Sequence, residues 1–84
     1  MNDKERAASE WRPVKSIDDL PPMDEDVLVT CADGHVAIAS VMDYMRTPSR
    51  LGWDFGEGWY ENWDYVLAWM PLPEAYKGVT RWQF

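Results

Sequence analysis

The segment from Trp53 to Tyr65 contains the residue types best suited to recognising a ligand. Six aromatic side chains are interleaved there with four carboxylates: Trp53, Phe55, Trp59, Tyr60, Trp63 and Tyr65 with Asp54, Glu57, Glu61 and Asp64. The face of an aromatic ring attracts a cation, and nearby carboxylates strengthen that attraction. The segment therefore predicts a binding surface for cationic groups, such as an arginine- or lysine-rich protein surface.

The part of this segment nearest to its glycines has the strongest claim to be exposed. The predicted binding residues are Trp59, Tyr60, Trp63, Asp54, Glu57, Glu61 and Asp64. The alternative is that the rings form the core, which we expect first for Trp53, Phe55 and Trp69. Rings also stack on nucleobases, so a nucleotide pocket is a second alternative, with phosphate donors from Arg46, Arg50, Lys77 or Arg81.

Catalytic chemistry has only one candidate pair. Cys31 and His35, the single cysteine and single histidine, could supply a thiolate and its base. We expect the two side chains to lie at opposite ends of a hairpin loop, which leaves Cys31 as a core thiol and His35 as an exposed turn residue. Two soft ligands are too few for a structural zinc site, and the sequence contains no P-loop, G-x-S-x-G or H-E-x-x-H motif. We therefore predict a protein that is not an enzyme and has no metal or cofactor.

Two acidic clusters precede the first predicted strand. The run from Asp24 to Asp26 offers oxygen ligands of the kind that Ca²⁺ prefers, but it lacks the spacing of a calcium loop, so we expect a solvated loop. Asp18 and Asp19 fall in the first turn of a short predicted helix, where carboxylates complement the helix dipole. Together the five acids leave open a further alternative, an acidic nucleic-acid mimic.

The elements that position these residues are mostly strands. Val27–Cys31 and Val36–Met42 flank Asp33-Gly34, which predicts a β-hairpin, and we expect Val36, Ile38 and Met42 to share one face. Alternation and short apolar runs predict further strands, at 53–55, 63–65 and 66–70, and Ser16 can cap a helical turn over 16–20. The predicted fold is α+β, mostly β, with a three- to five-stranded antiparallel sheet. One domain covers residues 11–74 between tails at 1–10 and 75–84.

Composition restricts the partners of this domain. The 84 residues have a net charge of −7, which repels phosphate backbones and attracts a basic protein, so we expect no direct nucleic-acid binding. The sequence has neither an apolar run long enough to span a membrane nor the apolar stretch of a signal peptide, and a single cysteine suits a reducing compartment. We expect a cytoplasmic protein that makes no membrane contact. Exposed sheet edges and surplus aromatic residues also favour a homodimer.

Several motifs together resemble a known family. Trp11-Arg-Pro-Val14, Leu20-Pro21, Val27-Leu-Val-Thr30, Asp33-Gly34 and the ending Ala68-Trp-Met-Pro-Leu-Pro-Glu74 are similar to domain-of-unknown-function family 551. Its members are short proteins found largely in phages and prophages. The resemblance implies a phage accessory protein in a bacterial host cell, and no particular activity.

These observations favour a non-enzymatic binding protein. The acidic, aromatic surface would contact a basic host protein, for example a defence protein that it inhibits. The alternative is a small-molecule binder, such as a sponge for a nucleotide signal, which would need a concave pocket.

Overall fold

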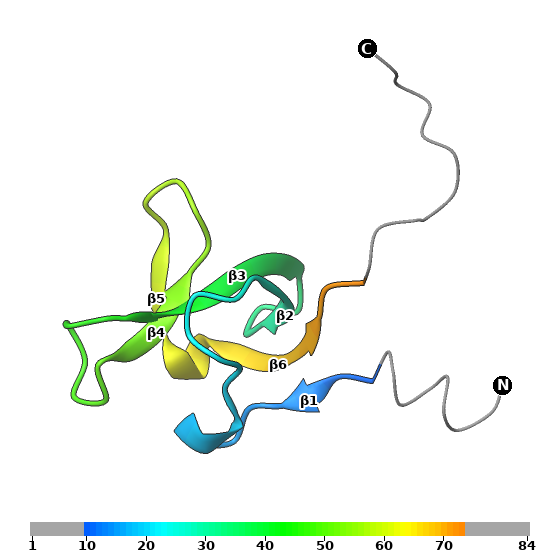
Figure 1. Cartoon of the computed structure of the whole chain (residues 1–84), viewed down its shortest axis with the longest axis horizontal. Coiled ribbons are helices and arrows are strands. Elements are labelled where there is room, and N and C mark those ends of the chain that lie inside the picture. The colour runs from blue at the N-terminus through cyan, green and yellow to red at the C-terminus, as the bar shows by residue number, and fades with distance from the viewer. Residues whose placement is uncertain (1–9, 74–84) are drawn as a thin grey trace, which may run out of the picture.

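The computed structural model describes residues 10–73, which form one antiparallel sheet of six strands. The strands are β1 (Arg12–Pro13), β2 (Val27–Cys31), β3 (Val36–Asp43), β4 (Leu51–Asp54), β5 (Tyr60–Asn62) and β6 (Val66–Pro71), in the order β1-β6-β2-β3-β4-β5 (Figure 1). The mostly β architecture is confirmed, but the prediction of three to five strands was too low. Two strands were missed because two or three residues are too few to show an alternating pattern. The predicted tails, apart from Glu10, lie outside the described residues.

The β2–β3 hairpin forms as predicted. Its register pairs Val27 with Ala39 and Thr30 with Val36. The backbone N–H of Gly34 donates to the carbonyl of Cys31 at 2.8 Å, which closes the turn. Gly34 has φ 94°, a left-handed conformation that glycine adopts without steric cost.

The long strand β3 joins two parts of the sheet. Its first half pairs with β2 and its second half pairs with β4, so β3 connects strands β1, β6 and β2 with strands β4 and β5 (Figure 1). Val36 and Ile38, two of the three residues expected to share one face, are exposed, whereas Ala39 on the opposite face is buried, so the alanine side of β3 is the one that packs. Trp53, on the neighbouring strand β4, is fully buried in the same core. The core consists of Val27, Val29, Cys31, Ala39, Val41, Trp53, Val66 and Trp69.

Trp69 joins three elements at the other end of the sheet. Its indole N–H donates to the carbonyl of Asp19 at 2.7 Å, and the Arg12 guanidinium lies 4.8 Å from the ring centroid. Asp19 ends η1 (Ile17–Asp19), a 3₁₀ helix within the helical turn predicted over 16–20. The Ser16 hydroxyl accepts from the backbone of Asp18, and the Asp19 carboxylate accepts from the backbone N–H groups of Lys15 and Ser16. These bonds form a capping box.

The segment Trp63–Tyr65 is also a 3₁₀ helix, η2, and the prediction of a strand there was wrong. The reason is tertiary: the buried Trp53 donates its indole N–H to the Trp63 carbonyl at 2.9 Å, and the Ala32 N–H donates to the Tyr65 carbonyl at 2.8 Å. These bonds tie η2, which lies between β5 and β6 along the chain, to β4 and to the β2–β3 turn. Within residues 10–73, no helix is long and apolar enough to cross a membrane.

Candidate functional site

A group of rings lies where the β2–β3 turn meets the β4–β5 turn, with Trp59 and His35 exposed and Phe55 and Tyr65 half-buried. Trp59 stacks on Phe55 with centroids 4.1 Å apart, and the His35 ring lies nearly parallel to Trp59 at 6.0 Å. Tyr65 meets both Phe55 and Trp59 edge-on, at 6.0 and 6.3 Å. We call these four residues, with Cys31, Asp33 and Glu61, the turn cluster. Offset stacks and edge contacts of this kind are the favoured arrangements of aromatic rings, so they hold the cluster together.

The β4–β5 turn presents Trp59 on a well-bonded backbone. Phe55 donates its N–H to the Trp59 carbonyl at 2.9 Å, and Trp59 donates to the Gly56 carbonyl at 3.0 Å. The Asp54 carboxylate accepts from the Gly56 N–H at 2.8 Å. Trp59 is nevertheless 38% exposed, so a large ring is held in place while part of it remains open to a partner.

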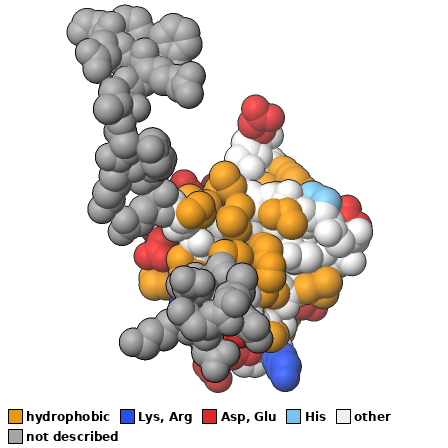
Figure 2. Space-filling model, turned by 90° about the vertical axis from the view of Figure 1, so that its right-hand side faces the viewer, with side chains coloured by type: hydrophobic (Ala, Val, Ile, Leu, Met, Phe, Trp, Pro, Cys, Tyr) orange, Lys and Arg blue, Asp and Glu red, His pale blue; other side chains and the backbone are white. Residues whose placement is uncertain are grey.

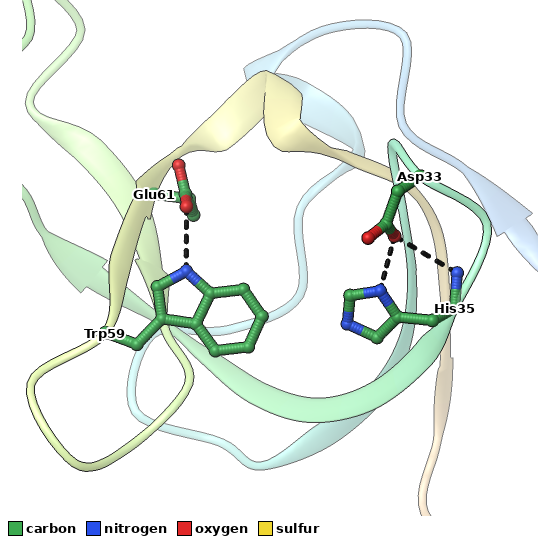
Figure 3. A network of polar contacts seen from close by, with 4 residues as sticks. All are labelled: Asp33, His35, Trp59 and Glu61. Carbon is green, nitrogen blue, oxygen red and sulfur yellow. Dashed lines mark hydrogen bonds and ion pairs between the residues drawn. The ribbon is translucent and has the colours of Figure 1, made fainter.

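Two carboxylates stand on opposite sides of this cluster. Figure 3 shows Trp59 with Glu61 facing Asp33 with His35. The Glu61 carboxylate accepts the indole N–H of Trp59 at 2.7 Å, while the Asp33 carboxylate contacts Nδ1 of His35 and accepts from the His35 backbone N–H at 3.2 Å. The open rings are therefore bordered by negative charge on both sides.

Cys31 and His35 stand at opposite ends of the hairpin loop, as expected, but their side chains lie close together. The Cys31 N–H donates to the His35 carbonyl at 2.9 Å, so the two residues face each other across the hairpin. Residues opposite each other in an antiparallel pair direct their side chains to the same face of the sheet. Ligand atoms of Cys31, Asp33 and His35 accordingly lie within 4.8 Å of one another. The expected burial was right, since Cys31 is buried and His35 is exposed.

The electrostatics of the cluster favour positive charge. Burial raises the pKa of the Cys31 thiol, and the carboxylates of Asp33 and Glu61 raise it further. Desolvation, followed by the same two carboxylates among its other causes, raises the pKa of the Tyr65 phenol. The backbone N–H of His35 is the main cause that lowers the pKa of Asp33, which keeps this carboxylate ionised. The thiol and phenol thus stay neutral at neutral pH while the Asp33 carboxylate stays charged.

Of the seven predicted binding residues, only Trp59 and Glu61 belong to the turn cluster. Tyr60 lies between them in sequence, and neighbouring strand residues point to opposite faces. Tyr60 lines a separate open hollow of about 610 Å³ together with Met42, Asp43, Tyr44, Met45, Arg46 and Gly58.

The other four predicted residues have local roles. Asp54 caps the β4–β5 turn, and Glu57 is an exposed residue of that turn with φ 55°. Trp63 gives its carbonyl to Trp53, while Asp64 accepts from the side-chain amide of Asn62 at 3.0 Å. The acids Asp24, Glu25 and Asp26 are exposed, as predicted for a solvated loop.

Sequence reasoning missed five of the seven cluster residues as binding residues, namely Cys31, Asp33, His35, Phe55 and Tyr65. The hairpin register contained a usable signal for Cys31 and His35. A turn at Asp33-Gly34 places position 31 opposite position 35, so one face had to hold both the thiol and the imidazole. No local pattern could show that the β4–β5 turn would lie beside this hairpin.

A second exposed surface lies on the outer side of the sheet. Leu28 pairs with Ile38 on one side and with Met70 on the other, which makes an apolar row across β6, β2 and β3. Ile38 is 53% exposed. Figure 2 shows one face of the molecule, on which hydrophobic side chains gather centrally and acidic side chains stand around them.

Comparisons with known proteins supply no function for this arrangement. No family model matches the chain, and neither the curated proteins nor the solved structures contain a match. The resemblance to domain-of-unknown-function family 551 therefore stays a prediction.

Proposed function

We propose that this chain is a non-enzymatic binding domain whose turn cluster receives a basic side chain of a partner protein. The observation that carries the proposal is the partly exposed Trp59 ring, stacked on Phe55 and bonded to Glu61. A rigid aromatic anchor in an otherwise polar surface is typical of the residues that dominate protein interfaces.

Charge supports a cationic partner group. Asp33 and Glu61 border the rings, and the chain as a whole carries a net charge of −7. A cation on an indole face contributes about 0.5–2 kcal/mol, depending on how far it is desolvated. An arginine fits better than a lysine, because a planar guanidinium can stack on Trp59 and bond a carboxylate at the same time. The contact between Arg12 and Trp69 is an example of such stacking within this chain.

The partner we propose is a basic protein of a bacterial host, which the domain would inhibit by covering its basic site. The resemblance to a phage and prophage family is what supports the host and the cytoplasmic setting. The acidic charge would also speed the encounter, since complementary charges steer association.

A pull-down from bacterial lysate with three forms of the protein tests this proposal. We expect wild type to retain a basic protein, Tyr60→Ala to retain it equally, and Trp59→Ala to lose it. Tyr60 is the matched control, because it is similarly exposed but lies outside the turn cluster. Retention should weaken as salt is raised. Equal retention by all three forms, or retention that salt does not change, would refute the proposal.

A small-molecule function is the second candidate, and the hollow beside Tyr60 favours it. Tyr60 could stack on a base, and Arg46 could meet a phosphate. A nucleotide would then raise the melting temperature of wild type and of Trp59→Ala, but would have no effect on Arg46→Gln. The two candidate functions thus respond to opposite sets of variants.

A further inference from the structure

Three different metal-binding side chains come together at the β2–β3 turn. The Cys31 thiol, the Asp33 carboxylate and the His35 imidazole offer ligand atoms that all lie within 4.8 Å of one another. In a tetrahedral zinc site, bond lengths of about 2.0–2.3 Å place neighbouring ligand atoms roughly 3.6 Å apart. Small side-chain rotations would therefore bring these three atoms onto one ion.

We propose that Cys31, Asp33 and His35 form a three-ligand site for a divalent transition metal of the zinc or cobalt kind. A sulfur, nitrogen and oxygen set suits these borderline ions, whereas Ca²⁺ and Mg²⁺ prefer oxygen ligands alone. Three protein ligands leave the fourth tetrahedral position open to water or to a ligand atom from a partner.

The backbone of the turn is already arranged to present these side chains. Cys31 and His35 are joined by a backbone bond of 2.9 Å, and the Gly34 N–H closes the turn onto the Cys31 carbonyl at 2.8 Å. The three ligands are thus spaced two residues apart on one short, bonded loop. Little chain entropy should be lost when an ion binds, because the loop is ordered beforehand.

Metal binding would change the protonation of two side chains, His35 and Cys31. The Asp33 carboxylate contacts Nδ1 of His35, so this nitrogen donates to it in the neutral ring. An ion would take the place of that hydrogen, which moves to Nε2 and leaves the imidazole neutral. The Cys31 thiol would lose its proton to solvent and bind as a thiolate. Binding of one ion therefore releases one proton.

The surrounding charge favours the ion and not the free thiolate. Asp33 and Glu61 both act on Cys31 and disfavour a second negative charge there. A divalent cation reverses this, because it neutralises the thiolate and is attracted by both carboxylates. Cys31 is buried while Asp33 and His35 are exposed, so the ion would enter from solvent by separating those two. The inference does not depend on the proposed partner binding.

Cobalt titration of the full, untagged, reduced chain tests the site. The chain has one cysteine and one histidine, so a sulfur-to-cobalt charge-transfer band can arise only from Cys31. We expect that band together with the visible bands of tetrahedral cobalt, saturating at one ion per chain. Zinc should displace the cobalt and abolish the colour.

Variants separate the three-ligand site from chance binding to the thiol. We expect His35→Ala and Asp33→Asn to weaken cobalt binding at least tenfold, and Cys31→Ser to abolish the charge-transfer band. Asp24→Asn, an exposed loop carboxylate outside the site, should bind cobalt as wild type does. Circular dichroism and melting temperature should show each variant folded.

Three outcomes would overturn the inference. They are the absence of the charge-transfer band, unchanged affinity in His35→Ala, or saturation at half an ion per chain, which would mean that two thiols share one ion. Trp59→Ala should keep the cobalt band, so failure of the metal site and failure of the proposed partner binding can be told apart.

Discussion

Replacement of Gly52 by alanine should destabilise the domain more than the same replacement at a glycine in one of the turns, because Gly52 has no room for a Cβ atom. Gly52 lies in β4, paired with Met42 on one side and Asn62 on the other. A Cβ atom added there would lie 2.5 Å from the backbone carbonyl oxygen of Glu61 and 2.7 Å from the Tyr44 Cβ. Ordinary contacts begin at 3.4 Å, so β5 would have to move by about 0.9 Å.

The size of the effect follows from what must move. Overpacking that shifts the backbone costs about 1–3 kcal/mol, and the Gly52→Ala clash belongs at the upper end because a carbonyl in a paired strand cannot rotate away. An 84-residue domain has a total stability of about 4–13 kcal/mol. At roughly 4–8 °C per kcal/mol, a loss of about 3 kcal/mol lowers the melting temperature by about 12–24 °C.

Gly34→Ala is the matched control for this prediction. Gly34 has φ 94°, but a Cβ there meets nothing within 4 Å, so its cost is backbone strain alone, about 1 kcal/mol. Urea unfolding followed by tryptophan fluorescence measures both variants. If Gly52→Ala lowers the free energy of unfolding by no more than Gly34→Ala does, β4 and β5 do not pack as closely as described.

Three further substitutions test the core and the caps, each by urea unfolding. Val29→Ala removes two methyl groups from a fully buried position and should cost about 2–3 kcal/mol; a loss under 0.5 kcal/mol, set as roughly the scatter of surface substitutions, would contradict its burial. Ser16→Ala removes the hydroxyl that accepts from Asp18 and should cost about 1 kcal/mol, whereas Ser16→Asp should retain most of the stability. Trp69→Phe leaves the Asp19 carbonyl without its donor and should cost about 1–3 kcal/mol; an unchanged midpoint would mean that this bond contributes nothing.

Local patterns were sufficient where local chemistry decides the structure. The β2–β3 hairpin follows from β-branched runs around Asp33-Gly34, and the first 3₁₀ turn follows from the Ser16 cap. The pattern failed at Trp63–Tyr65, whose alternation of aromatic and acid predicts a strand. There a bond from the distant Trp53 ring decides in favour of a 3₁₀ turn.

Only part of the site was predictable, because contacts between segments distant in the sequence also decide its composition. Trp59 and Glu61 could be named because an aromatic ring and an acid near glycines favour an exposed binding surface. Their assembly with Asp33 and His35 depends on how β3 bends between its two partners, which no short window of sequence describes. That Trp59 is exposed while Trp53 is buried likewise depends on where β4 and β5 lie relative to the rest of the sheet.

The short outer strands have a consequence for how the protein behaves at high concentration. β1 is two residues long and includes Pro13, which has no N–H to donate, and β5 is three residues long. Such edges offer another chain too few bonding groups to extend the sheet, which protects a protein against fibril growth. Because β1 pairs with Ala68 and Trp69 of β6, loss of that pairing would expose the bonding groups of these two residues at the edge of β6. A form of the chain that begins after Pro13 should therefore aggregate faster than the 84-residue chain, even while its core stays folded.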